Sequence, residues 1–433
     1  MANKKLTDVN KNYIPIALFD TNQELQLLYK TALQHDAQAI FKSWLDQLCP
    51  IISVVEINDF QQALYFLYHY RGSEDTFNAY RKELERFLQW SWFIRKQSIL
   101  KHNSLDIEAF IEFCKAPPKN WIATKTVKRF IVKAGKRIPN PEWRPFNVKV
   151  SKKAFQDGER PTYTHFELSQ KGLKAIFAVL GSFYNYMIQE EHMAANPVMQ
   201  IRQKSKFIQK QQSSPPIRRL SNYQWDVVIQ MAQSLAIEKP EVYERSLFIL
   251  SALYGMYLRI SELAAINHWT PTMGDFYRDN HNNWWFKTIG KGNKERHIAV
   301  SDAMLGALKR WRQYLGLSAL PYPGETFPLI PNYTRKQPIS STRAIRQMVQ
   351  DCFDAAVTQL RLSDSEEAEL LRSATVHWLR HTGISEDVKH RPREHVRDDA
   401  GHGSSAITDK YIDVELKARH ASAKTKQLNQ HKD

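Results

Sequence analysis

The sequence predicts a mainly α-helical protein with a small antiparallel β-sheet, built as an all-α domain followed by an α+β domain. Apolar residues recur at helical spacing through both halves of the chain. One aromatic and β-branched pattern, between residues 284 and 300, has the composition and central turn of a β-hairpin. The chain has 433 residues, enough for two or three domains with cores of ordinary size.

The N-terminal half holds the predicted all-α domain, residues 56–205, after a helical extension, residues 1–55, that carries no chemical signature. From Ser73 to Leu88 the apolar side chains fall on one face of a helix, and Ser73 is a suitable N-cap. A second helix is predicted over residues 106–115. A third, over residues 169–189, has an apolar stripe suited to a core.

A basic insert, residues 116–160, lies between the second and third of these helices. It holds twelve Lys or Arg residues against three acids, with Trp121, Trp143 and Phe146 interleaved. Its prolines argue against one continuous helix. The composition fits either a solvated basic loop or a surface that contacts the DNA backbone, and the sequence alone leaves both interpretations open.

A basic linker, residues 206–219, separates the two predicted domains. The stretch from Arg202 to Arg219 carries six basic residues and no acid, and it contains Ser213-Ser-Pro-Pro216. That composition is typical of interdomain connections. The α+β domain is expected over residues 220–420, and a polar, basic tail over residues 421–433.

The α+β domain begins with a clear helix-start signal. Ser221 and Gln224 form a capping box, and Leu220 forms a hydrophobic staple with Trp225. A second, largely apolar helix is predicted over about Val242 to Leu258.

Two later regions complete this domain. The hairpin strands are expected over Trp284–Ile289 and Arg296–Val300, with Lys291 near the tip. The run from Ala344 to Leu371 is predicted to be helical, and Thr375 is placed to cap the helix that follows.

The composition indicates a soluble intracellular protein with a polyanionic partner. The formal net charge is +16 within an ordinary globular composition, so nucleic acid is favoured over an anionic membrane surface. The three cysteines have no paired spacing and predict a reducing cytoplasm without a zinc site. No apolar run reaches the length of a membrane span, so no membrane partner is expected.

The residues that suggest chemistry gather near the C-terminus. His377 and Arg380 stand at i and i+3 of a predicted helix and so share a face. His402 follows Gly401, and Tyr411 comes nine residues later. Such a set can bind a phosphate, stabilise its charge and attack it. A metal site is not expected, because the histidines lack the HExxH spacing of zinc enzymes.

Two residues further upstream extend this set. Arg259 comes directly after the apolar helix, where it needs either an anion or a carboxylate partner such as Glu262. Lys291 on the hairpin can reach into a groove and protonate a leaving oxygen, although a plain exposed turn residue fits the same pattern.

Five separated motifs now occur in the order of a known family. They are Arg259-Ile-Ser-Glu-Leu, the Gly-Lys-Gly-Asn-Lys hairpin, His377-x-x-Arg380-His-Thr, Gly401-His402-x-Ser-Ser and Tyr411. Over roughly residues 216–420 the chain resembles the tyrosine recombinase (phage integrase) family, which includes lambda-type integrases and the Xer recombinases. Residues 57–205, without the basic insert, resemble the family's helical core-binding (SAM-like) domain. The extension and the insert have no counterpart in the minimal family plan.

The resemblance implies that residues 220–420 form a catalytic domain acting on a DNA phosphate. Arg259 and Arg380 would clamp the non-bridging oxygens of the scissile phosphate and stabilise its charge in the transition state. His377 and His402 would hydrogen-bond the same phosphate and assist proton transfer.

The resemblance also implies covalent catalysis. Tyr411 would be the nucleophile and form a 3′-phosphotyrosyl link. Lys291 would be the general acid for the departing 5′ oxygen, with Lys294 as a competitor for that role. Because the link conserves the phosphodiester energy, no ATP, metal or other cofactor is implied.

Two residues beside the site depart from the family pattern. Tyr257 stands where a glycine often precedes the Leu-Arg pair, and Ala400 replaces the usual leucine before Gly-His. Both lie outside the chemistry, so activity is still expected.

The resemblance therefore implies a site-specific recombinase, the integrase of a mobile element. Its expected partners are double-stranded DNA at attachment sites, further copies of the chain in a tetramer on DNA, and accessory DNA-bending factors. The expected location is the cytoplasm of a bacterial or phage system, on the nucleoid. Two alternatives are a degenerate relative that only binds DNA and a type IB topoisomerase. The residues expected to contact DNA are Arg81, Lys82, Lys125, Lys128, Lys133, Arg137, Lys294 and Arg296.

Overall fold

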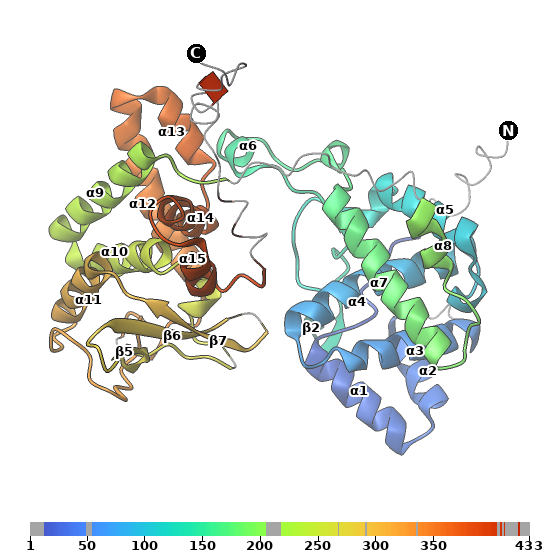
Figure 1. The fold of residues 1–433 in the computed structure, drawn as a ribbon. Helices are drawn as coiled ribbons and strands as arrows, with labels where there is room; N and C mark the ends of the chain where they lie inside the picture. Colours follow the sequence, from blue (N-terminus) through green and yellow to red (C-terminus); the bar gives the residue numbers. More distant parts are fainter. Residues whose placement is uncertain are drawn as a thin grey trace, which may run out of the picture. The chain divides into compact units, whose positions relative to one another are not determined.

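The fold consists of two compact units, one within Met1–Ser213 and the other within Ser214–Asp433 (Figure 1). The computed structural model describes residues 13–48, 54–204, 218–266, 268–290, 292–334 and 337–404, together with residues 408, 411, 423 and 424. None of the helices described is long and apolar enough to cross a membrane.

The first unit is a helical bundle. Its helices are α1 (Asn22–Gln34), α2 (Ala37–Leu48), α3 (Val54–His69), α4 (Glu74–Gln89), α5 (Ser104–Lys115), α7 (Gln170–Gln189) and α8 (Pro197–Lys204), and a π-helical turn (Trp90–Arg95) extends α4. The predicted starts of α4 and α7 are confirmed. The side chains of Ser73 and Ser169 accept hydrogen bonds from the backbone N–H groups of Thr76 and Gly172, respectively.

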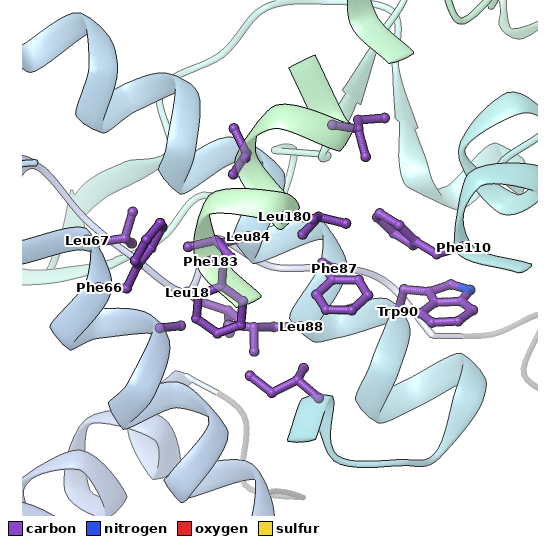
Figure 2. Packing of buried hydrophobic residues seen from close by; sticks show 14 of the residues in the cluster. Leu18, Phe66, Leu67, Leu84, Phe87, Leu88, Trp90, Phe110, Leu180 and Phe183 are labelled. Atoms are coloured by element: carbon purple, nitrogen blue, oxygen red, sulfur yellow. The ribbon is translucent and has the colours of Figure 1, made fainter. Parts of the chain in front are cut away.

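One apolar core joins the main helices of this unit. Leu180 and Phe183 of α7 lie in the same cluster as Phe87 of α4 and Phe110 of α5 (Figure 2). Leu18, which precedes α1, belongs to this cluster as well. The described part of residues 1–55 is therefore built into the core of the bundle, and does not form a separate appendage.

The basic insert folds into short strands and a one-turn helix. Its elements are β1 (Ile122–Ala123), β2 (Phe130–Lys133), β3 (Lys136–Pro139), β4 (Phe146–Asn147) and α6 (Lys152–Gln156). This confirms the prediction that the insert is not one continuous helix. β1 pairs with β4 in parallel, and β2 pairs with β3 as an antiparallel hairpin. Ala134 and Gly135 form the hairpin turn, both with positive φ, which suits the twist of a two-residue turn.

Ion pairs anchor the β2–β3 hairpin to the bundle. Arg129 pairs with the buried carboxylate of Glu85, which also accepts the backbone N–H of Phe19 at 3.1 Å. Arg137 binds Asp20 through two nitrogens, one of them 2.7 Å from a carboxylate oxygen. Phe130 packs against Trp143 in a small apolar cluster. The hairpin is thus held against the bundle by contacts that the sequence did not predict.

The second unit has seven helices and one sheet among its described residues. The helices are α9 (Asn222–Glu238), α10 (Pro240–Gly255), α11 (Asp302–Tyr314), α12 (Thr342–Ser363), α13 (Ser365–Arg372), α14 (Val376–Asp387) and α15 (Arg393–Ala400). The capping box of Ser221 and Gln224 at the start of α9 is confirmed.

The sheet is antiparallel, in the order β5 (Phe276–Arg278), β6 (Trp284–Gly290) and β7 (Lys294–Ala299). The predicted hairpin is confirmed, with Gly290 opposite Lys294 at its end. α15 packs beside β7 (Figure 1). There the side chain of Asp399 accepts the backbone N–H of Ala299 at 3.3 Å.

Two predicted helix boundaries differ from the structure. The expected helical run from Ala344 to Leu371 is two helices, because the Asp364 side chain accepts the backbone N–H groups of Glu366 and Glu367 and starts α13. The apolar helix ends at Gly255 and not near Leu258, because the chain turns sharply at Tyr257, whose φ is +51°.

Candidate active site

Four segments of the second unit meet where the chemistry-bearing residues lie. Arg259 comes just after α10, and Arg296 lies on β7. Arg380 belongs to α14, and His402 follows α15. Hydrogen bonds connect each of the three arginines to the chain around Gly401. Arg259 donates to the Gly401 carbonyl at 3.4 Å, Arg296 to that of Asp399 at 3.0 Å, and Arg380 to that of Ala400 at 2.5 Å.

Glu262 is the buried carboxylate that positions two of these arginines. Its oxygens accept both terminal nitrogens of Arg296, at 2.6 and 2.8 Å, and one nitrogen of Arg259 at 3.0 Å. Burial on its own raises the pKa of Glu262, but hydrogen bonds and charge from Arg296, together with Arg259, outweigh it and hold the pKa below its ordinary value. The Arg259 side chain remains 30% exposed, so it can still bind an external oxyanion.

Arg380 is buried without a carboxylate partner among the described residues. It donates to the backbone carbonyls of Tyr257 and Ala400. Burial, together with the charges of the nearby Arg259 and Arg296, lowers its pKa to about 9. The site thus holds three arginines but one buried carboxylate, Glu262. The excess positive charge favours an anionic ligand.

Tyr257 links the Arg380 side chain, which its carbonyl binds, to a second polar network formed by Asp387 and Arg391. Its φ of +51° lies in the left-handed region, which glycine adopts without strain. The buried tyrosine is held there by its hydroxyl, which donates to Asp387 and accepts from Arg391 at 2.9 Å. Burial and the charge of Asp387 raise its pKa, so the hydroxyl stays protonated.

The histidines are kept neutral at physiological pH. Burial, reinforced by Arg380 and Arg259, lowers the pKa of His377 and takes that of His402 to about 4. His402 follows Gly401, whose φ of +64° ends α15, and its Nδ1 lies 2.8 Å from the Thr408 hydroxyl. A neutral imidazole can donate one hydrogen bond to a phosphate without adding charge.

Tyr411 is buried beside these imidazoles. Its ring lies parallel to that of His402, with centroids 5.6 Å apart, and its hydroxyl is 2.5 Å from Nδ1 of His381. The ring packs with Val396 and Ala400. Burial raises the pKa of Tyr411, whereas Arg380 and Arg259 act to lower it. Tyr411, the predicted nucleophile, thus lies beside His381 and His402.

The hairpin end lies against the same cluster. A Cβ added at Gly290 would lie 2.9 Å from a Glu262 carboxylate oxygen and 3.3 Å from an Arg259 guanidinium nitrogen. Only a glycine therefore fits there without displacement. Lys291, the predicted general acid, is the next residue and lies outside the described residues. Lys294, its competitor, is exposed and pairs with Gly290 across the hairpin.

Two of the arginines expected to contact DNA are engaged within the protein. Arg81 donates to the carbonyl of Asp20 and to Asn78, and Arg296 is held by Glu262. A DNA contact stays a prediction for both. Arg137 is half-exposed but bound to Asp20. Lys82, Lys125, Lys128, Lys133 and Lys294 are exposed, so a DNA contact stays a prediction for them.

Sequence reasoning missed two features of the site. The bidentate bond between Arg296 and Glu262 joins residues on separate elements and has no local sequence signal. His381 did have one, since it follows His377 by four residues on α14 and therefore shares its face. No group of three or more His, Cys, Asp or Glu residues suited to a metal ion occurs in the part of the chain that the structure describes.

Comparison with known proteins relates the second unit to a known family. The phage integrase family matches residues 218–417. The tyrosine recombinase XerC of Actinobacillus pleuropneumoniae serotype 7 (strain AP76) is 27% identical over 146 residues, which are 33% of this chain and 41% of that protein. The chain thus aligns with less than half the length of this curated relative.

A solved structure shares the fold along most of the chain. The XerH site-specific recombinase, bound to palindromic difH substrate in a post-cleavage complex, aligns with 95% of this chain and 99% of its own, with a TM-score of 0.53 and 14% identity. At this identity the likeness concerns the fold, mainly α with a small antiparallel sheet.

Proposed function

Because residues 218–417 belong to the phage integrase family, we propose that this protein is a site-specific DNA recombinase that cleaves and rejoins DNA through a 3′-phosphotyrosyl intermediate. The observation that supports this best is a buried tyrosine hydroxyl, that of Tyr411, placed among neutral imidazoles beside arginines with excess positive charge. That arrangement suits attack on a phosphodiester.

The proposed reaction begins with the phosphate held by Arg259 and Arg380. Arg259 is partly exposed and fixed by Glu262, and Arg380 has no competing carboxylate among the described residues. Both therefore offer donors to the non-bridging oxygens at little cost of reorganisation. His377 and His402, being neutral, add hydrogen bonds to the same phosphate.

In the chemical step, the Tyr411 oxygen forms a bond to phosphorus and the bond to the 5′ oxygen breaks. The 5′ oxygen leaves as a hydroxyl after taking a proton from a general acid, for which we propose Lys291. Its neighbour Gly290 lies against Arg259, which supports this choice. A 5′ hydroxyl from another strand can reverse the step, since the phosphotyrosyl link retains the energy of the original bond.

Substitution of Tyr411 by Phe tests the proposal. We expect the covalent adduct to disappear while DNA binding persists, because the change removes only the attacking oxygen. The substrate is a library of nicked duplexes with randomised sequence, from which the unaltered protein selects its site by forming an adduct. An adduct that survives in Tyr411→Phe contradicts the proposal.

The purified protein and the selected duplexes also distinguish a recombinase from a DNA-binding relative and from a topoisomerase. A protein that binds the selected duplexes without ever forming an adduct is a DNA-binding relative. Relaxation of supercoiled plasmids without a selected site indicates a topoisomerase.

The proposal extends to the partners of the chain. We propose that it acts on double-stranded DNA at attachment sites of a mobile element, as a tetramer with accessory DNA-bending factors, in the cytoplasm at the nucleoid. The net charge of +16 supports a DNA partner.

A further inference from the structure

We propose that His381 is the base that takes the proton of Tyr411 when the tyrosine attacks DNA, and returns it when the link is reversed. This inference rests on the proposed function. It assigns a catalytic role to a residue that the sequence motifs leave without one.

The geometry places His381 at the reacting atom. Its Nδ1 lies 2.5 Å from the Tyr411 hydroxyl, and the ring centroids are 5.3 Å apart. Among the described residues, this is the hydroxyl's one hydrogen-bond partner. A donor and acceptor at this separation are already arranged for proton transfer.

The helix that carries His381 is firmly seated. A Cβ added at Gly383 would lie 2.2 Å from the carbonyl oxygen of Tyr254, so α14 packs directly on the backbone at the end of α10. Leu379 and Ile384 of α14 are fully buried. The imidazole is therefore held by a rigid element, as proton transfer over a short distance requires.

The other two histidines are differently placed. His402 stacks on the face of the Tyr411 ring, with an interplanar angle of 17°, and its Nδ1 is engaged with Thr408. His377 contacts the His381 ring edge-on, at a centroid distance of 4.3 Å. His381 is thus the histidine whose nitrogen faces the hydroxyl.

The protonation state suits a base. Burial lowers the pKa of His381 to about 4, and His377 and Arg380 on its own helix and His402 on the following segment act in the same direction. The ring is neutral at physiological pH, so Nδ1 can accept while the proton resides on Nε2.

The bound phosphate makes this base effective. An imidazole of low pKa is a weak base, but the negative charge of the phosphate offsets the arginines and favours an imidazolium. Transfer then accompanies attack: the hydroxyl proton moves to Nδ1 as the oxygen–phosphorus bond forms. The departing 5′ oxygen takes its proton from the separate general acid, so one proton is accepted and another is donated.

The test compares His381→Asn with the matched control His390→Asn, an exposed histidine beyond the site, in the full chain. The substrate is the duplex selected by the unaltered protein, made with either an oxygen or a sulfur at the bridging 5′ position. A sulfur leaving group departs without protonation. We expect the rate of adduct formation by His381→Asn to fall by about 10² or more on both substrates. His390→Asn should match the unaltered protein.

Chemical rescue gives a second measurement. Replacing Tyr411 by a difluorotyrosine, a more acidic phenol, should restore much of the lost rate in His381→Asn, because less help from a base is needed. Should His381→Asn fail to fold, the same tyrosine analogue in the otherwise unaltered chain should make adduct formation less dependent on pH. An unchanged pH dependence in that protein overturns the proposal.

Three further outcomes would overturn it. The first is an unchanged rate of adduct formation in His381→Asn. The second is a rate lost on the oxygen substrate but restored on the sulfur substrate. The third is a faster rate in His381→Asn, which would mean that the contact restrains the tyrosine. Failure of the recombinase assignment looks different, since adduct formation would then be absent in the unaltered protein or insensitive to Tyr411→Phe.

Discussion

At the scale of single residues, Glu262 determines how the positive charge of the site is arranged. It is 1% exposed, and it holds both Arg259 and Arg296. Removing one member of a buried ion pair leaves the other charged and desolvated, which costs more than the pair itself contributes. The carboxylate is therefore as important to the site as the arginines that it orients.

We expect Glu262→Gln to lower the free energy of unfolding by about 3 kcal/mol at neutral pH and to slow adduct formation. The folded-state pKa of Glu262 is depressed, so its contribution is fully present above its ordinary value of 4.5 and is lost as pH falls through the lower folded value. The difference between the two proteins should thus shrink in acid. Urea titrations at several pH values measure it.

The control for this prediction is Glu295→Gln. Glu295 is an exposed carboxylate on β7, next to Arg296, and it pairs with His297 at 3.2 Å. Exposed pairs contribute little, so a change within about 0.5 kcal/mol is expected. Equal effects of the two substitutions would contradict the role given to Glu262.

At the scale of elements, the β2–β3 hairpin carries a charge arrangement that needs an external partner. Lys133 and Lys136 stand directly opposite each other across the strands, and both are exposed. Like charges in this position are destabilising. By contrast, Arg129 and Arg137 pair with carboxylates of the bundle and anchor the hairpin. A polyanion such as DNA would offset the repulsion at the tip.

The double substitution Lys133→Ala with Lys136→Ala should weaken DNA binding and reduce its salt dependence. If each lysine neutralises one phosphate, the slope of log affinity against log salt should fall by about 1.8. The matched control is Lys171→Ala with Lys174→Ala, two exposed lysines of α7 in the same unit. DNA affinities measured across a salt series give this slope for each variant. An unaltered slope for the hairpin variant would mean that the hairpin does not contact the DNA backbone.

Elements defined by contacts between sequence neighbours can be predicted from the sequence, whereas elements that depend on distant residues cannot. The Ser221 and Gln224 box involves neighbours in sequence, so its signal was visible. The split at Asp364 was missed because the periodicity of apolar residues continues across it. The strands of the insert depend on contacts with Asp20 and Glu85, more than forty residues away in the chain. The motifs of the site are local in sequence and can be recognised there, whereas the bond between Glu262 and Arg296 joins separate elements and has no such signal.

At the scale of the whole molecule, the two units have separate apolar cores. Leu180 belongs to the first core and Leu253 to the second, and both side chains are buried. Each core draws its members from its own unit alone. A chain built in this way can unfold in more than one cooperative step.

We therefore expect Leu180→Ala and Leu253→Ala to affect different unfolding transitions. Each should destabilise its own unit by about 2–5 kcal/mol, because a buried leucine leaves a cavity. Differential scanning calorimetry should show one transition moved by each variant and the other left in place. A single transition that moves equally with both would show that the units unfold together.

The contact between α15 and the edge of the sheet has a consequence for solubility. β7 is an edge strand, and an uncovered edge can pair with the same strand of another molecule. Here the carboxylate of Asp399 takes the N–H of Ala299, and the Asp399 carbonyl takes the Arg296 side chain. The helix that leads to the histidine and tyrosine of the site thus also shields this strand from intermolecular β-pairing, so its loss would expose the protein to aggregation as well as to inactivity.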